Sequence, residues 1–406
     1  MDTGDTAWVL MSAGLVMLMT PALGFFYGGL VRRKNALSTI MHSFFILALI
    51  SVQWVLWGYT LSFGPDLGGV IGGLDWIGLR SVGPDPNPDY AATIPHSAFM
   101  MYQGMFAIIT PALITGAFAE RMRFKALVIF TLLWATVVYA PIAHSVWAVG
   151  GWLRDYGALD FAGGTVVHIS SGVSALVAAI VLGKRKGFGK EEMEPHNLTL
   201  TVLGAGLLWF GWFGFNAGSA LAANGLAANA FVVTNTAAAM GAVTWMTIAW
   251  LRDGHPSVLG AAAGAVAGLV AITPASGFVG PSSSIVIGFG AGALCFYALD
   301  LIKERFGIDD ALDVFAVHGI GGIWGALATG LFADSAINSA GEGLFFGNPD
   351  QLLKQAAAVG GVAGFAAIAS FVILKAIDVT VGLRVPEEEE IAGLDPTTHG
   401  EFAYQL

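Results

Sequence analysis

Two histidines lie within long apolar stretches of the chain, and each follows an aspartate by eight residues. The pairs are Asp160 with His168 and Asp310 with His318. An ionisable side chain inside a membrane segment is costly unless it lines a polar path or has a partner, so it indicates a functional site. A neutral imidazole carries one donor and one acceptor nitrogen, and two facing rings could therefore share a proton. The matching contexts predict that His168 and His318 form a pair.

A metal site or an intramembrane enzyme is a weaker interpretation of the same residues. A metal site would need further ligands, but no third histidine joins the pair, no H-E-x-x-H motif occurs, and the chain has only one cysteine. That residue, Cys295, lies in an apolar run, which excludes an intramolecular disulfide and favours a packing role. No nucleophile motif accompanies the histidines, which disfavours an enzyme. We therefore expect no metal and no cofactor.

Composition identifies the elements that must hold these residues. Of the 406 residues, 56% are hydrophobic and 11% are charged, whereas a soluble domain carries roughly 25% charged residues. Mean hydropathy is +0.72. Apolar runs of roughly 20 residues, enough to cross a bilayer, recur from near Ala7 to Thr380, and we count about eleven. The sequence predicts an all-α polytopic membrane protein with eleven transmembrane helices, embedded in a lipid bilayer and without a nucleic-acid partner.

Lysine and arginine fall mainly in alternate loops. Such basic loops remain on the cytoplasmic side of a membrane. With an odd number of spans, the bias predicts that the N-terminus is outside and the C-terminus inside. The basic residues in these loops are Arg32, Arg33 and Lys34, then Arg121, Arg123 and Lys125, then Lys184, Arg185, Lys186 and Lys190, and finally Arg252, Lys303 and Arg305.

The repeated Asp-x7-His spacing also predicts internal symmetry. Five spans per repeat require an inverted relation between the halves, and inverted repeats place substrate sites near the membrane midplane. We predict a transmembrane domain over residues 1–384 with pseudo-repeats at about 7–185 and 198–332. A final helix is expected at about 356–380, followed by a cytoplasmic tail over 385–406.

Several segments together resemble the ammonium transporter family, the bacterial and archaeal relatives of the Rhesus proteins. The resemblance covers essentially the whole chain. It rests on GFFYGGLVRRKN at 24–35, ITPALITGAFAERMRF at 109–124, APIAHSVW at 140–147, DFAGGTVVHISSGVSALVAAIVLGKR at 160–185, WFGFNAGSA at 212–220, DDALDVFAVHGIGGIWG at 309–325 and GLDPTTHGEFAY at 393–404.

The resemblance implies a role for each matching residue. An outer site that recruits ammonium would use Trp147, Ser219 and Tyr102, with Asp160 stabilising the local backbone and the cation. Many family members have phenylalanine where Tyr102 stands, so its hydroxyl is a departure from the pattern. A gate of two stacked rings would follow, and then the histidine pair in the pore. The gate residues are Phe106 and Phe215, the pore residues His168 and His318, and the supporting residues Asp310, Asp313, Asn216, Gln103, His144 and Phe26.

The function expected from this resemblance is ammonium transport as a homotrimer in the cell membrane. Ammonium, with methylammonium as an analogue, would be recognised outside, and ammonia would cross the dry pore. Net charge transfer and neutral ammonia conduction are both compatible with these residues. A different interpretation is an ammonium sensor that signals to a cytoplasmic partner. The tail resembles those that bind a P-II signalling protein, which is the expected cytoplasmic partner.

Overall fold

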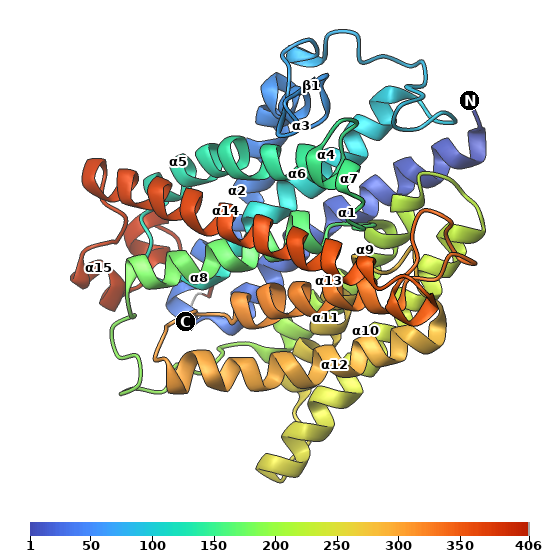
Figure 1. The fold of residues 1–406 in the computed structure, drawn as a ribbon. Helices are drawn as coiled ribbons and strands as arrows, with labels where there is room; N and C mark the ends of the chain where they lie inside the picture. The colour runs from blue at the N-terminus through green and yellow to red at the C-terminus, as the bar shows by residue number, and fades with distance from the viewer. Residues whose placement is uncertain (405–406) are drawn as a thin grey trace.

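The computed structural model describes residues 1–404, so the last two residues of the predicted tail, 405–406, lie outside the described residues. The chain is a bundle of α-helices with one small hairpin (Figure 1). The helices are α1 Thr3–Leu30, α2 Ala36–Gln53, α3 Tyr59–Phe63, α4 His96–Ile114, α5 Phe124–Trp134, α6 Ala140–Trp147, α7 Trp152–Tyr156, α8 Ser170–Leu182, α9 Leu198–Ala217, α10 Gly225–Asp253, α11 Val258–Ile272, α12 Pro281–Asp300, α13 Gly321–Phe332, α14 Asp350–Thr380 and α15 Glu387–Ala392. The hairpin pairs β1, Asp66–Leu67, antiparallel with β2, Ile71–Gly72.

Short irregular turns interrupt or extend several of these helices. Five are 3-10 turns: η1 Arg33–Asn35, η3 Ile77–Leu79, η4 Thr115–Phe118, η7 Gly218–Ala220 and η10 Leu344–Phe346. Six are π turns: η2 Trp54–Gly58, η5 Ala135–Tyr139, η6 Gly164–Ile169, η8 Leu301–Arg305, η9 Phe315–Ile320 and η11 Asp395–His399. Each predicted pore histidine lies on one of the π turns, His168 on η6 and His318 on η9. Single π turns are rare and occur often at functional sites.

Ten of the helical stretches in residues 1–404 are long and apolar enough to cross a membrane. The predicted all-helical membrane class is confirmed at this level. The remaining apolar helix, α11, has only 15 residues, or about 22 Å at the α-helical rise, against roughly 30 Å of hydrocarbon. The final helix, α14, begins at Asp350, six residues before its expected start near residue 356.

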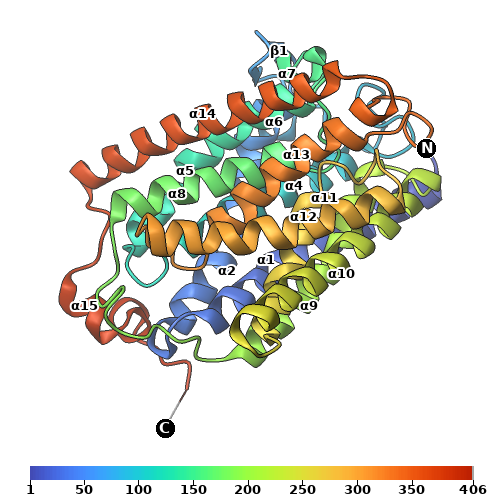
Figure 2. The same cartoon turned by 60° about the horizontal axis from the view of Figure 1, so that its bottom comes forward.

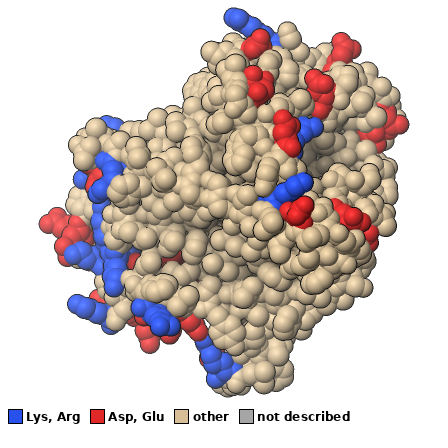
Figure 3. Space-filling model, viewed as in Figure 1, with Lys and Arg blue, Asp and Glu red and all other residues tan. Residues whose placement is uncertain are grey.

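The helices lie side by side with the chain's start and its tail at opposite ends. In two views, α8, α12, α13 and α14 run alongside one another, while the N-terminus and α15 lie at opposite ends of the bundle (Figures 1 and 2). Most lysines and arginines on the viewed face gather at the end that carries α15, beside a broad uncharged band (Figure 3). This is the distribution of a protein whose middle lies in hydrocarbon.

The tail is bound to the loops at the α15 end. Glu390 is buried and accepts hydrogen bonds from Arg384 and from the backbone N–H of Lys186 at 2.7 Å. Asp395 accepts from the first free amides of α2, those of Leu37 at 3.0 Å and Ser38 at 2.8 Å. The tail is therefore an integral part of this face and caps a transmembrane helix there.

A network of buried charges lies beneath the tail. The Arg185 guanidinium contacts Asp309 at 2.8 Å and Glu120 at 3.2 Å, and Arg32 contacts Glu120 at 2.8 Å. Burial by itself would raise the pKa of Glu120, but the charges of Arg185 and Arg32 hold that pKa below its ordinary value. The network joins the loops that follow α1, α4 and α8 to the segment that precedes η9.

Glycine brings the histidine-bearing segments into contact. A Cβ atom placed on Gly172 of α8 would lie 2.2 Å from the backbone nitrogen of Gly319 in η9. A Cβ atom on Gly322 would lie 3.0 Å from the Cβ of His168. Only glycine allows backbones to approach this closely, so the crossing of α8 and η9 depends on it.

We expect Gly172→Ala to destabilise the protein. The added methyl group meets backbone atoms that cannot rotate away, and overpacking of this kind costs about 1–3 kcal/mol or more. The measurement is the temperature at which the detergent-purified protein loses its size-exclusion peak. Gly364→Ala is the matched control, because Gly364 lies in α14 and a Cβ atom added there would have no other atom within 4 Å. Equal midpoints for the two variants would contradict the role of the crossing.

Candidate functional site

A cavity of about 180 Å³ opens at the end of the bundle opposite α15. Three of the predicted residues line it, Phe106, Trp147 and Ser219, and the predicted supporting residue Gln103 does so as well. The amide oxygen of Gln103 is buried without a hydrogen-bond partner in the described chain. The other lining residues are Phe63, Asp89, Tyr90, Phe99, Arg154, Phe161 and Leu221. The cavity therefore offers aromatic faces and a few acceptor oxygens.

Hydrogen bonds hold both the indole and the backbone of Trp147 in place. Its Nε1 donates to the backbone carbonyl of Asp160 at 2.9 Å, and Arg154 donates to the backbone carbonyl of Trp147 at 2.9 Å. The ring meets Phe106 edge-on, with ring centres 5.8 Å apart. An indole fixed at the wall of a cavity can present its face to a cation.

Tyr102 lies behind this cavity and does not line it. Its side chain is fully buried, with 0% of the residue exposed, and its ring packs edge-on against Phe106 at 5.0 Å. The hydroxyl lies 2.9 Å from the carbonyl oxygen of Gly214, 2.8 Å from that of Phe215 and 3.1 Å from Ser219 Oγ. Ser219 Oγ in turn donates to the Phe215 carbonyl at 2.9 Å.

Phe106 and Phe215 form a contacting pair at the bottom of the cavity, with their rings tilted by 46° and not stacked as expected from the resemblance. Their ring centres are 4.4 Å apart and both side chains are buried. Phe106 comes from α4 and Phe215 from the last turn of α9. The pair separates the outer cavity from a second, apolar cavity beneath it.

That second cavity is narrow and contains the two histidines. Its volume is about 10 Å³, at the lower limit for one water molecule. His168 Nδ1 and His318 Nδ1 are 3.2 Å apart, and the rings are inclined by 22°. A hydrogen bond between these atoms needs a proton on one of them, so the pair can hold one shared proton between two nitrogens. The remaining lining is carbon and ring surface from Met19, Leu23, Phe26, Ile109, Leu113, Val167, Leu208, Trp212, Phe215 and Val266.

Asp160 organises the start of the segment that carries His168. Its carboxylate accepts from the backbone N–H groups of Gly163 and Gly164 at 2.7 Å and of Thr165 at 2.8 Å. The Thr165 hydroxyl donates to it as well. These are free amides at a helix start, so the Asp160 carboxylate caps the segment that carries His168.

Asp310 occupies the corresponding place before His318. It accepts from the Phe315 N–H at 2.7 Å, while its Oδ1 is buried with no partner among the described residues. Burial, with the nearby charge of Asp313, raises the pKa of Asp310 to about 6. Asp313 has a positive φ of 61° and pairs with Lys303 at 2.7 Å. Asp310 thus caps η9, and Asp313 supplies a separate charged contact.

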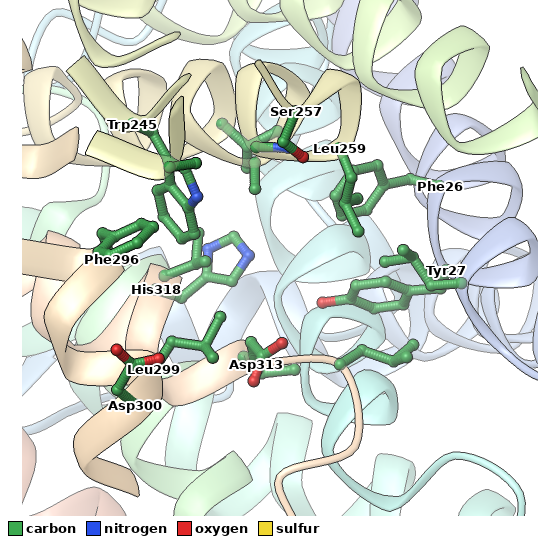
Figure 4. A pocket seen from close by; sticks show the side chains of 18 of the residues that line it. Phe26, Tyr27, Trp245, Ser257, Leu259, Phe296, Leu299, Asp300, Asp313 and His318 are labelled. Atoms are coloured by element: carbon green, nitrogen blue, oxygen red, sulfur yellow. The ribbon is translucent and has the colours of Figure 1, made fainter. Parts of the chain in front are cut away.

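A third cavity, of about 220 Å³, opens on the other side of His318. Figure 4 shows the His318 imidazole projecting into it, with Tyr27, Trp245 and Asp313 around the ring. Phe26 lines both this cavity and the pore cavity. The three cavities therefore follow one another, with His168 and His318 between the outer and inner openings.

Two other supporting residues lie outside the cavity linings. Asn216 is buried and donates to Thr234 Oγ1 at 3.0 Å, which ties α9 to α10. His144 contacts the Ser62 carbonyl at 3.1 Å and Asp66 Oδ1 at 2.9 Å, which ties α6 to the hairpin. The contact with His144 holds the pKa of Asp66 below its ordinary value. Both residues position elements of the site.

Sequence reasoning missed Trp212. Its ring stacks on His168 at 5.5 Å, and its Nε1 donates to Thr273 Oγ1 at 2.9 Å. A signal was present, because Trp212 precedes Phe215 by three residues and so shares a face of the same helix. Asp66 and Arg154 were also missed, and their distance in sequence from the residues they contact offered no comparable signal.

Comparison with known proteins identifies relatives of the whole chain. The model of the Ammonium Transporter Family matches residues 7–404, which confirms the resemblance seen in the sequence. An ammonium transporter of Bacillus subtilis is 56% identical over 406 residues, covering 100% of this chain and 99% of that protein. The crystal structure of Saccharomyces cerevisiae Mep2 superimposes with a TM-score of 0.89 at 39% identity and covers 95% of this chain and 91% of that one. A structure described as a sensor Amt protein gives a TM-score of 0.90 at 30% identity, with 98% of each chain covered.

We expect Asp160→Ala to destabilise the protein strongly. The substitution leaves several buried N–H groups without an acceptor, at a cost of about 3 kcal/mol or more in the free energy of unfolding. Asp160→Asn should be intermediate, since its NH2 group would face N–H donors. The measurement is again the thermal midpoint in detergent, with the exposed Asp155→Ala as control. Equal thermal midpoints for Asp160→Ala and the control would contradict a capping role for Asp160.

Proposed function

We propose that this chain, which belongs to the ammonium transporter family, binds ammonium in the outer cavity, removes a proton there and conducts ammonia through the pore. The relatives named above supply the substrate class, because the Bacillus subtilis protein is named an ammonium transporter. The same comparison and the ten apolar helices identify a multi-pass membrane protein. Because that relative is named as a transporter, we propose no enzymatic activity.

The observation that carries this proposal is the change in lining along the path. Above the rings of Phe106 and Phe215 the cavity has about 180 Å³ and polar atoms, whereas the cavity below them has about 10 Å³ and mostly carbon. A bare cation that entered the lower cavity would lose hydration that two imidazoles cannot replace. Neutral ammonia loses far less hydration than the cation. Ammonium is therefore expected to lose its proton above the gate, before ammonia enters the lower cavity.

Each residue of the outer cavity has a distinct proposed role. The fixed indole of Trp147 would attract ammonium through its ring face, worth up to about 2 kcal/mol when the ion is partly desolvated. Ser219 Oγ would accept a hydrogen bond from the ion. Asp160 would act through the backbone that it caps and through its negative charge, without touching the ion. Phe106 and Phe215 would open briefly to admit ammonia.

The histidine pair is the proposed route of the proton. His168 and His318 both line the pore cavity, and His318 also lines the inner one, so their 3.2 Å contact links the pore to the inner cavity by one hydrogen bond. If the proton released outside follows this bond, each turnover moves one charge. If it returns to the outside, the protein is a neutral ammonia channel, which is the alternative mode of transport.

We also propose the finer membrane arrangement, with eleven spans, an external N-terminus and an internal tail. In support, α11 is apolar throughout and lies between two membrane-length helices. Basic side chains gather at the α15 end (Figure 3), as expected of a cytoplasmic face. The inverted pseudo-repeats gain support from Asp160 and Asp310, each of which accepts from backbone amides at the start of a histidine-bearing segment. A homotrimer in the cell membrane completes this proposal.

A sensor is the second candidate function. The likeness to a structure described as a sensor Amt protein favours it, since 98% of both chains align. In such a role the outer cavity would bind ammonium and the tail would report occupancy. The tail's contacts with α2 and with the loop after α8 offer a physical link to a cytoplasmic partner.

We expect ammonium pulses to produce a sustained current from proteoliposomes on a solid-supported membrane, with a smaller methylammonium response and little response to potassium. His168→Ala should remove the proton route and lower the ammonium current about a hundredfold, the scale of a lost proton-transfer group. The exposed His255→Ala is the control and should leave the current unchanged.

Other outcomes separate the alternatives. An unchanged ammonium current and selectivity in His168→Ala would contradict the relay. No current from the wild-type protein, with protein-dependent alkalinisation of the lumen, would identify a neutral channel. Neither current nor alkalinisation, with ammonium still bound, would favour the sensor.

We expect the purified protein to retain a P-II protein on an affinity column, and we expect deletion of 385–406 to abolish this binding. Asp395→Ala provides a milder test, because it releases the tail from α2 without shortening it. It should weaken binding if the docked tail is recognised. Equal retention by the wild type and the deletion variant would show that P-II binds elsewhere.

A further inference from the structure

We infer that the hydroxyl of Tyr102 is a positioning group for ammonium recognition, which acts by fixing Ser219 and the end of α9 without contacting the ion. This inference rests on the proposed function and specifies which residue sets affinity at the outer cavity. It differs from the role expected from the sequence, in which the ring of Tyr102 faces the ion.

The position of the Tyr102 ring argues against a direct contact with the ion. Tyr102 is absent from the cavity lining and is fully buried. Phe106 packs edge-on against it at 5.0 Å and itself lines the cavity. An ion in the cavity would therefore meet the ring of Phe106 and not that of Tyr102.

The hydroxyl of Tyr102 completes the end of α9. The last carbonyls of a helix have no partner within the helix. Tyr102 Oη lies within hydrogen-bond distance of two carbonyls in the last turn of α9, that of Phe215 at 2.8 Å and that of Gly214 at 2.9 Å, which also accepts from the Gly218 N–H. A phenol from α4 thus offers its one proton to the carbonyls at the end of α9, one of which belongs to Phe215, the residue that carries one ring of the gate.

The number of available protons determines which hydrogen bonds Ser219 Oγ can donate and accept beside the Tyr102 hydroxyl. The phenol and the serine hydroxyl have one proton each, and they face two carbonyl oxygens as well as each other. If the phenol donates to a carbonyl, the Ser219 proton goes to the Phe215 carbonyl or to the phenol oxygen. If the phenol donates to Ser219, the Ser219 proton goes to the Phe215 carbonyl. In both arrangements Ser219 donates inside the protein and keeps a lone pair for the cavity.

Two hydrogen-bond partners, its anchors, therefore hold Ser219 Oγ so that it can accept a hydrogen bond from the cavity. One anchor is the Phe215 carbonyl at 2.9 Å, and the other is the Tyr102 hydroxyl at 3.1 Å. An acceptor is what ammonium requires, because the ion has four N–H donors and no lone pair. A phenylalanine at this place would keep the ring contact with Phe106 and lose one anchor.

The test is Tyr102→Phe in the current assay, read as KM for ammonium and as maximal current. Loss of one hydrogen bond that orients the acceptor should raise KM about three- to tenfold and leave the maximal current within about twofold. Ser219→Ala should also raise KM. Because both substitutions act through the same oxygen, the double variant should be no worse than Ser219→Ala alone.

Two further variants make the result specific. Tyr297→Phe removes the hydroxyl of an exposed tyrosine and should change nothing. Tyr102→Leu removes the ring and the hydroxyl together. If Tyr102→Phe has wild-type KM and only Tyr102→Leu is impaired, the ring is the active part and our inference is wrong. A KM effect that multiplies with that of Ser219→Ala, or a lowered melting temperature with unchanged KM, also overturns it.

Failure of the proposed function would be recognised separately. If the wild-type protein gives no ammonium current and no lumenal alkalinisation, transport is absent whatever Tyr102 does. The inference is then tested by the rise in melting temperature on adding ammonium, since a ligand that binds the folded state stabilises it. Tyr102→Phe should show a smaller rise than the wild type at the same ammonium concentration, and an equal rise would overturn the inference.

Discussion

The site depends on one carboxylate. The Asp160 carboxylate accepts hydrogen bonds from the free amides at the start of η6. In nonpolar surroundings these amides need an acceptor from the protein itself. Its backbone carbonyl also accepts from Trp147 Nε1. One residue therefore fixes the outer aromatic wall and the first turn of the segment that holds His168. The eight-residue spacing to His168 has a physical cause, because a non-helical stretch returns the amides of Gly163 to Thr165 to the carboxylate, and about one turn of η6 then leads from Gly164 to His168.

The two Asp-His units differ in how their carboxylates are hydrogen-bonded. Asp160 uses both carboxylate oxygens on backbone groups, whereas Asp310 binds one amide and leaves Oδ1 without a partner in the described chain. Asp313 and Lys303 form an ion pair beside the larger inner cavity. The outer half is thus a fixed arrangement suited to binding, and the inner half is open and charged, suited to release into water.

Sequence reasoning predicted those features that follow from local pattern. Apolar runs predicted the helices, and the Asp-x7-His spacing predicted that His168 and His318 would meet. The resemblance selected Phe106 and Phe215 among 27 phenylalanines. It did not predict the direction of the Tyr102 hydroxyl, because that depends on how α4 lies against the end of α9. The π turns and the contact between His144 and Asp66 are likewise set by packing between distant segments.

The narrow pore is a consequence of backbone packing as much as of its lining. Gly172 and Gly322 allow α8, η9 and α13 to lie so close that a Cβ atom would meet backbone or His168. That approach sets the 3.2 Å contact between the imidazoles and leaves room for hardly one water. A wider crossing would break the contact between the rings and admit water, and a wet pore could carry hydrated ions. Under the proposed function, discrimination between ammonia and an ion would therefore rest on glycines that lie outside the cavity linings.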